Sequence, residues 1–185
     1  MSVLDYEDFA LTFAGVSKAT ATVLPLRAGP TIVVTVAFGA DGLEAPGGRL
    51  ADLADSLTGH GDPHVLVAVL DHVQVPFRLA LRVAVDPDRE TEVVLAGVEA
   101  AVTQAFAFGV RSFGATVEAS RVLAVAHSVP GVLAVDLDRL YVNTASLHQH
   151  RLVAPAATTT ASGTATPAGV LVAAPSPFDW LEVMT

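Results

Sequence analysis

The chain of 185 residues contains no cysteine, which excludes a disulfide scaffold, a thiolate metal site and a cysteine nucleophile. Ten Lys and Arg residues stand against nineteen Asp and Glu residues, and the net charge of -9 argues against general binding to nucleic acid or anionic membranes. Although 52% of the residues are hydrophobic, no apolar run reaches the roughly 20 residues of a membrane helix. We therefore expect a protein without membrane insertion that is assembled in the cytoplasm. Its apolar excess indicates either surface buried against partner subunits or an Ala- and Val-rich composition bias.

Residues 1–74 predict a first small α/β module. Ser2 and Asp5 have the spacing of a capping box, so an amphipathic helix is expected over residues 3–13. Thr31–Phe38 is β-branched and apolar, as is typical of a buried strand. The other elements expected here are a strand over 16–24, a loop over 39–48, a helix over 50–57 ended by Gly59, and a strand over 64–70.

Residues 75–150 predict a second α/β module. Phe77–Asp86 alternates strictly between apolar and more polar positions, which indicates a strand with one face on a core. Asp86 and Pro87 have the residue types of an N-cap and a first helical position, so a helix is expected over 88–106. A second amphipathic helix over 118–128 and a strand over 132–140 are expected to follow.

The C-terminal part of the chain changes in composition. Residues 151–169 are rich in Ala, Thr and Pro and lack periodicity, which is typical of a flexible or extended linker. Residues 170–185 form an apolar C-terminal segment, with a short strand over 169–173 and a rigid corner at Pro175-Ser176-Pro177. Because so apolar a terminus needs a partner surface on its own body or on a neighbour, we predict an interface at Phe178, Trp180 and Leu181.

Two turns of the chain share one pattern. A predicted helix leads through glycine directly into a predicted strand at Gly15-Val16 and again at Pro130-Gly131-Val132. Glycine suits both places because it enters a left-handed turn without a Cβ clash. Together with the expected elements, this repetition predicts an α+β fold of two small mixed modules, each a three- or four-stranded sheet backed by helices.

Metal binding is one alternative function. His148 and His150 alternate on an extended segment, so their side chains point the same way and could hold one ion. The same pair also suits an exposed polar loop. The remaining histidines fit turns, strand ends or a polar helix face: His60, His64, His72 and His127.

Two carboxylates provide the other candidate chemistry. Asp136 and Asp138 are expected on one strand face, where they could bind a hard cation, a small ligand or a proton. The simpler interpretation is pairing with Arg78 and Arg82 on a neighbouring strand. The sequence contains no glycine-rich phosphate loop and no nucleophile elbow. We therefore predict no catalytic residue, no cofactor and no metal, with a small-ligand or metal-binding α/β domain as the alternative.

Several short pieces of the sequence recur in a known family in this order and spacing. They are Asp5-Tyr6-Glu7-Asp8, Ala14-Gly15-Val16, Val85-Asp86-Pro87-Asp88-Arg89-Glu90, Phe106-Ala107-Phe108-Gly109, Arg111-Ser112-Phe113-Gly114 and Val129-Pro130-Gly131-Val132. Over residues 2–142 the chain resembles the C-terminal region of baseplate J-like proteins, which occur in contractile phage tails and related extracellular contractile injection systems.

This resemblance implies a structural role. Members of the family build the wedges of a baseplate ring, so the expected partners are other baseplate subunits and copies of the chain itself. The resemblance transfers no catalytic residue. The long N-terminal region of a full member is not present here, which implies a fragment or a short paralogue.

Overall fold

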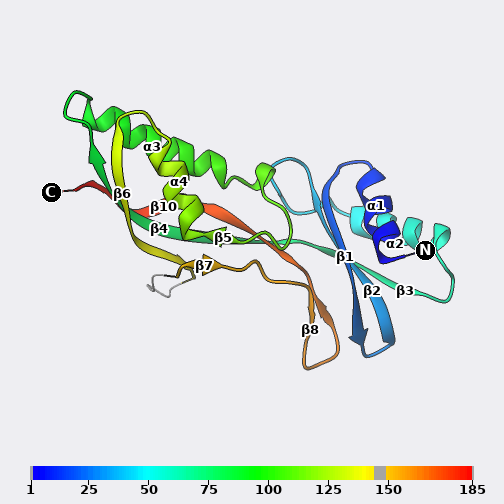
Figure 1. Ribbon diagram of the computed structural model, residues 1–185. Coiled ribbons are helices and arrows are strands. Elements are labelled where there is room, and N and C mark those ends of the chain that lie inside the picture. Colours follow the sequence, from blue (N-terminus) through cyan, green and yellow to red (C-terminus); the bar gives the residue numbers. More distant parts are fainter. Residues whose placement is uncertain (1, 144–148, 185) are drawn as a thin grey trace. The chain divides into compact units, whose positions relative to one another are not determined.

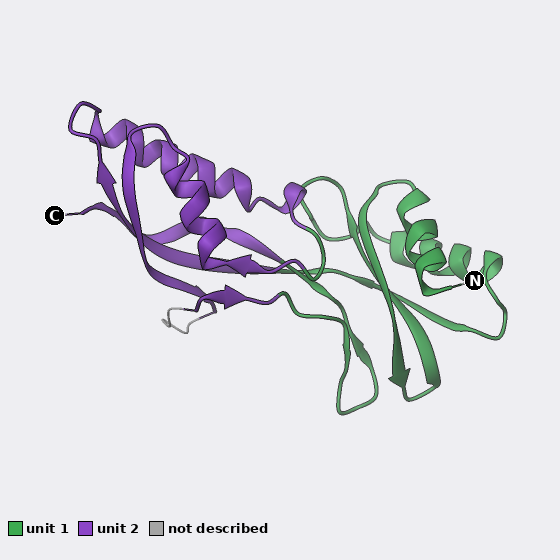
Figure 2. Cartoon of the chain, viewed as in Figure 1, with its two compact units in different colours: residues 1–74, 112–114, 154–170 green, residues 75–111, 115–153, 171–185 purple. Residues whose placement is uncertain are grey.

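The computed structural model describes residues 2–143 and 149–184, whose elements are shown in Figure 1. The chain divides into two compact units, coloured separately in Figure 2. The first unit comprises residues 1–74, 112–114 and 154–170, and the second comprises residues 75–111, 115–153 and 171–185. Each unit therefore gathers three separate stretches of sequence. No helix in the described part is long and apolar enough to cross a membrane.

The first unit is a three-stranded sheet with two helices. Its elements are α1 (Val3–Thr12), β1 (Val16–Leu26), β2 (Gly29–Phe38), α2 (Arg49–His60), β3 (Leu66–Asp71), β8 (Thr158–Thr159) and β9 (Ala165–Thr166). The sheet order is β1-β2-β3, with β1 antiparallel and β3 parallel to β2. The capping box is present, because Asp5 accepts from the Ser2 amide and Ser2 Oγ accepts from the Asp5 amide.

The core of the first unit lies between its sheet and its helices. Tyr6 of α1 and Leu53 of α2 are fully buried against one face of β2, which contributes Val34 and Val36. This arrangement follows from the period-2 pattern of β2, because alternate apolar side chains reach the helices.

The other face of this sheet is covered by residues 154–170. The amide of Ala168 donates to the buried Thr35 Oγ1 at 3.1 Å. Close packing within this stretch depends on Gly169, since a Cβ would lie 2.5 Å from Pro155 Cγ. The stretch 151–169, which composition predicts to be a linker, instead contains β8 and β9 as a hairpin. Threonine hydroxyls pair across that hairpin, with Thr158 Oγ1 2.7 Å from Thr166 Oγ1.

The second unit is also a three-stranded sheet with two helices. Its elements are β4 (Val73–Val85, which starts in the first unit), α3 (Thr91–Ala105), a 3-10 turn (Phe108–Val110), β5 (Val117–Glu118), α4 (Ala119–His127), β6 (Val132–Val142), β7 (Arg151–Leu152) and β10 (Gly169–Val183). The sheet order is β10-β4-β6, and β5 pairs with β7. The predicted α+β fold with two mixed modules is therefore confirmed.

Helix α3 begins later than the sequence predicts. Asp86 does not cap it, because Asp86 Oδ1 accepts from the Asp88 amide at 3.0 Å and Asp86 O accepts from the Arg89 amide at 2.9 Å. These bonds close a tight turn before the helix. The N-cap is Glu90, and the predicted start at residue 88 is wrong by three residues.

Strand β10 is longer than predicted. The expected short strand, rigid corner and terminal segment form one strand, which passes through Pro175 and Pro177. An edge strand tolerates proline because the missing amide can face away from the ladder.

Candidate functional site

Arg82 lies between the two carboxylates that the sequence singles out. Its Nη2 is 2.8 Å from Asp136 Oδ2 and 2.6 Å from Asp138 Oδ1, and its Nε is 2.8 Å from Asp138 Oδ2. The register places Arg82 opposite Asp136, and a bulge in the pairing adds Asp138 beside it. The expected pairing with Arg82 is therefore present.

Asp138 also joins the C-terminal segment to the sheet. It accepts a hydrogen bond from Trp180 Nε1 at 3.3 Å, while the Arg139 guanidinium carbon lies 4.4 Å from the Trp180 ring centroid. The Arg82 hydrogen bond, aided by that of Trp180, lowers the pKa of the Asp138 carboxyl. A carboxylate held ionised in this way is a poor proton donor.

A second carboxylate cluster centres on Asp179. Arg78 Nε donates to Asp179 Oδ1 at 2.7 Å, and the Tyr141 hydroxyl donates to Asp179 Oδ2 at 2.8 Å. Burial raises the pKa of Asp179, but the hydrogen bonds from Tyr141 and Arg78 outweigh it, so the pKa lies below its ordinary value. Arg78 was expected to pair with Asp136 or Asp138; that detail is wrong, because β10 brings Asp179 to it.

These lowered pKa values predict an acid-sensitive second unit. A carboxylate with a lower pKa in the folded than in the unfolded chain stabilises the fold above the unfolded value of about 3.9, and its contribution is lost as the pH falls through the folded value. We expect Asp179→Asn to lower the free energy of unfolding at pH 7 by about 1–2 kcal/mol. The difference from the wild type should shrink as the pH falls below the unfolded value of about 3.9. Urea unfolding followed by circular dichroism at several pH values measures this, and a pH-independent difference would contradict it.

The predicted interface residues lie on β10. Phe178, Trp180 and Leu181 are half-buried. Directly after the strand, the Met184 amide donates to Val83 O at 2.9 Å. The apolar terminus is thus attached to its own sheet. Its role as an interface stays a prediction.

The histidines do not form a site in the described residues. His150 is held through its main chain, since its carbonyl accepts from the Ala119 amide at 2.9 Å, and His148 lies outside the described residues. His72 Nδ1 is 2.9 Å from Asp71 Oδ1 and His60 Nδ1 is 2.9 Å from Ser56 O. Over residues 2–143 and 149–184, no three His, Asp or Glu side chains gather closely enough to hold a metal ion.

Both predicted glycine turns adopt left-handed conformations. Gly15, before Val16 of β1, has φ +89°, and Gly131, between Pro130 and Val132 of β6, has φ +94°. At Gly131 a Cβ would also lie 2.9 Å from Val94 Cγ2. Any side chain there would add both backbone strain and a steric clash.

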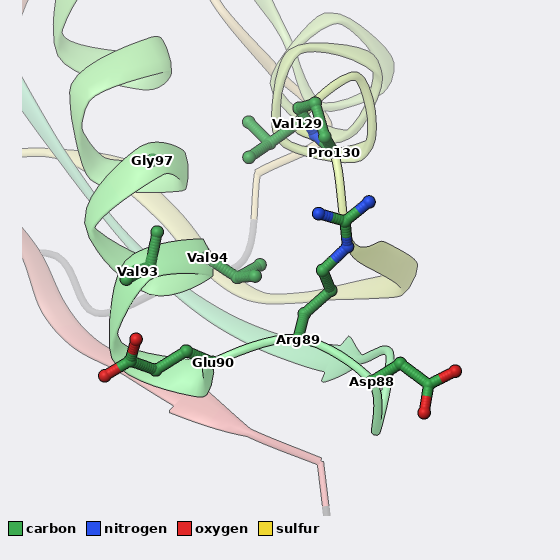
Figure 3. Close-up of a pocket in the computed structure, with 8 residues that line it drawn as sticks. All are labelled: Asp88, Arg89, Glu90, Val93, Val94, Gly97, Val129 and Pro130. Carbon is green, nitrogen blue, oxygen red and sulfur yellow. The ribbon is translucent and has the colours of Figure 1, made fainter.

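A groove of about 540 Å³ lies beside this turn. Figure 3 shows Asp88 and Glu90 pointing to opposite sides and the Arg89 guanidinium extending toward Pro130. The remaining lining is mostly apolar. Because the two carboxylates diverge, the groove does not have the paired acid and base of a hydrolytic site.

Sequence reasoning missed the structural role of Arg111. Its guanidinium donates to three carbonyl oxygens: Leu171 O at 3.2 Å, Ala115 O at 3.0 Å and Thr116 O at 2.7 Å. Burial lowers the pKa of Arg111. A single arginine in the weakly charged stretch 105–117 is the signal that could have identified it.

The carboxylate clusters of the second unit are internal ion pairs, formed by Arg82 with Asp136 and Asp138 and by Arg78 with Asp179. This is the arrangement of a structural protein. Residues 1–70 match the family model described as the Baseplate J-like central domain, a stretch that spans α1 to β3. Over residues 1–70 the resemblance to baseplate J-like proteins of phage tails is thereby confirmed, with the central domain rather than the C-terminal region, and over residues 71–142 it stays an expectation. No curated protein matches the chain. The domain indicates a structural role in a phage tail baseplate, in contact with other tail components.

Proposed function

We propose that the chain is a structural subunit, or part of one, of a phage-tail-like baseplate wedge, and that it acts by subunit packing in a contractile injection apparatus. The match of residues 1–70 to the Baseplate J-like central domain carries this proposal. Its partners are other baseplate subunits and copies of itself. It is assembled in the cytoplasm and then becomes part of the tail or tail-like particle.

The chemistry of the described residues supports a role without catalysis. The carboxylates with lowered pKa values in the second unit, Asp138 and Asp179, are engaged by arginine, tyrosine or tryptophan side chains. Arg82 forms ion pairs with both Asp136 and Asp138, and this disfavours binding of a cation or a small ligand at the two carboxylates. Such networks hold strands together without offering a free acid, base or nucleophile.

The surface supports packing against other chains. Apolar side chains remain more than half exposed in both units: Leu4, Val23 and Leu43 in the first, and Val93, Val110, Leu133 and Val153 in the second. Burial of these side chains against a partner chain would remove apolar surface from water and so favour association.

Location within the particle tests the proposal. The chain is tagged in the host that produces the tail-like particles, the particles are purified on a density gradient, and immunogold label is located by electron microscopy. We expect label at the baseplate end of the tail. Label along the whole sheath, or intact particles that carry no label, would contradict the proposal.

A further inference from the structure

The sheet of the first unit has one protected edge, at β1. On β1 the Ala21 amide donates to Glu7 Oε2 at 3.0 Å, and directly after the strand the Arg27 amide donates to Gly163 O at 2.9 Å. Pro25 offers no amide, and the register is irregular between Val16 and Lys18. Caps, prolines, charges and bulges are the means by which proteins prevent an edge strand from pairing with another chain.

The edges of the second unit's sheet are protected as well. Strand β6 carries two irregularities in its register, together with Asp136 and Asp138. Strand β10 carries Pro175, Pro177 and Asp179. Both edges therefore have features that disfavour pairing with a further strand.

The β3 edge of the first unit differs. In the described residues β2 is its only neighbour in the sheet, and its first five residues, Leu66–Leu70, contain neither proline nor charge. The strand ends at Asp71, whose Oδ2 accepts from the Ala45 amide at 2.7 Å, so the carboxylate lies only at one end of this edge. Leu66 is 45% exposed, and the other four are half-buried. An apolar stretch of edge strand that carries no proline or charge, such as Leu66–Leu70, is the kind that pairs with another chain.

The backbone of β3 offers hydrogen-bonding groups on its open side. The His72 amide donates to Val36 O on β2 at 3.0 Å, so the even-numbered residues point toward β2. Because successive residues alternate, the amides and carbonyls of Val67 and Val69 point outward.

The sequence of this edge is self-complementary. Leu66-Val67-Ala68-Val69-Leu70 reads the same in both directions. We propose that β3 pairs antiparallel with β3 of a second copy, about a two-fold axis at Ala68. Val67 of each copy then lies opposite Val69 of the other and exchanges two main-chain hydrogen bonds with it, as an isologous interface requires.

The flanking residues permit this register. Leu66 lies opposite Leu70 of the second copy, and Asp71 lies opposite Val65, so no carboxylate faces another across the pair. The two sheets join into one with the order β1-β2-β3-β3-β2-β1. This inference rests on the proposed function, because it names one surface through which copies of the subunit pack.

Two matched lysine substitutions test the edge. Leu66 and Val23 are 45% and 52% exposed and lie on opposite edge strands of the same sheet. Leu66→Lys and Val23→Lys should therefore change the free energy of unfolding by similar amounts. Sedimentation velocity of the full chain should show wild type and Val23→Lys as dimers. Leu66→Lys should weaken dimerisation by roughly tenfold or more. Circular dichroism and thermal melting confirm that both variants fold.

A mixing experiment tests the register. In a mixture of Leu66→Lys and Leu70→Glu chains, the introduced lysine faces the introduced glutamate, while the other leucine pair is unchanged. The mixture should therefore dimerise more tightly than either variant alone. A Val23→Lys and Leu70→Glu mixture, which lacks the facing charges, is the control.

The inference is overturned if the wild type is monomeric at all concentrations, if Val23→Lys disrupts the dimer as strongly as Leu66→Lys, or if mixing restores nothing. A monomer that binds a strand of another baseplate subunit at β3 also overturns the choice of a second copy. The immunogold experiment is independent of these results, so failure of the dimer and failure of the baseplate role are distinguishable.

Discussion

Replacement of Phe106 by alanine is expected to lower the free energy of unfolding of the second unit by about 3–5 kcal/mol. Phe106 is 1% exposed and packs edge-on against the fully buried Phe77, with ring centroids 5.3 Å apart. It ends α3, and its carbonyl accepts from the Ala173 amide of β10 at 3.0 Å. Phe106→Ala removes the ring that packs between α3 and the sheet. It leaves a cavity that small shifts of α3 and the sheet cannot fill.

Urea unfolding followed by Trp180 fluorescence measures this effect, because the only tryptophan of the chain lies in the second unit. Val110→Ala, at a position that is 65% exposed, provides the control and should change stability by less than about 0.5 kcal/mol. A loss below about 1 kcal/mol for Phe106→Ala would show that this ring does not support the core as described.

Arg111→Met is expected to cost about 2–4 kcal/mol, because the substitution leaves three carbonyl oxygens without their donor. Arg111→Lys should recover little of the loss, since one ammonium group cannot reproduce a planar guanidinium that spans three acceptors. The guanidinium carbon also lies 5.6 Å from the centre of the Phe106 ring, so both predictions concern one connected region.

Arg121→Met is the matched control, because Arg121 is an exposed arginine on α4 of the same unit. Its effect should stay within about 0.5 kcal/mol. Equal losses for Arg111→Met and Arg121→Met would mean that lost positive charge, rather than lost hydrogen bonds, causes the change. Full rescue by Arg111→Lys would lead to the same conclusion.

Elements with a strong local signal could be predicted from the sequence. Helix α1 has a capping box, β2 is a β-branched apolar run, and β4 alternates with period 2 over Phe77–Val85. Each of these patterns acts between residues near one another in sequence, so it can be recognised without knowledge of the fold.

Elements that depend on distant contacts could not be predicted in the same way. Residues 154–170 have the composition of a linker, yet the Ala168 amide donates to Thr35 of the first sheet, and Gly169 is required where the backbone passes close to Pro155. Strand β6 breaks its alternation at Leu133, because the register irregularity between Ala84 and Val85 leaves this residue out of the pairing, and its side chain is 58% exposed. Composition and periodicity carry no record of such tertiary packing.

The charged residues show the same division. The Arg82 pairing with Asp136 and Asp138 follows from the strand pattern, because both strands were recognised. The Asp179 cluster was not expected, since β10 was predicted to end before that residue. Once β10 is known to continue past Pro177, Arg78 and Tyr141 have a carboxylate within reach.

Deletion of the gene that encodes this chain tests the central claim most directly, with electron microscopy of the particles that the host then produces. If the chain is a structural part of the baseplate, the preparation should contain tubes and sheaths that lack a joined baseplate, and the intact gene supplied in trans should restore complete particles. Complete, normally contracting particles formed without the chain would contradict the account.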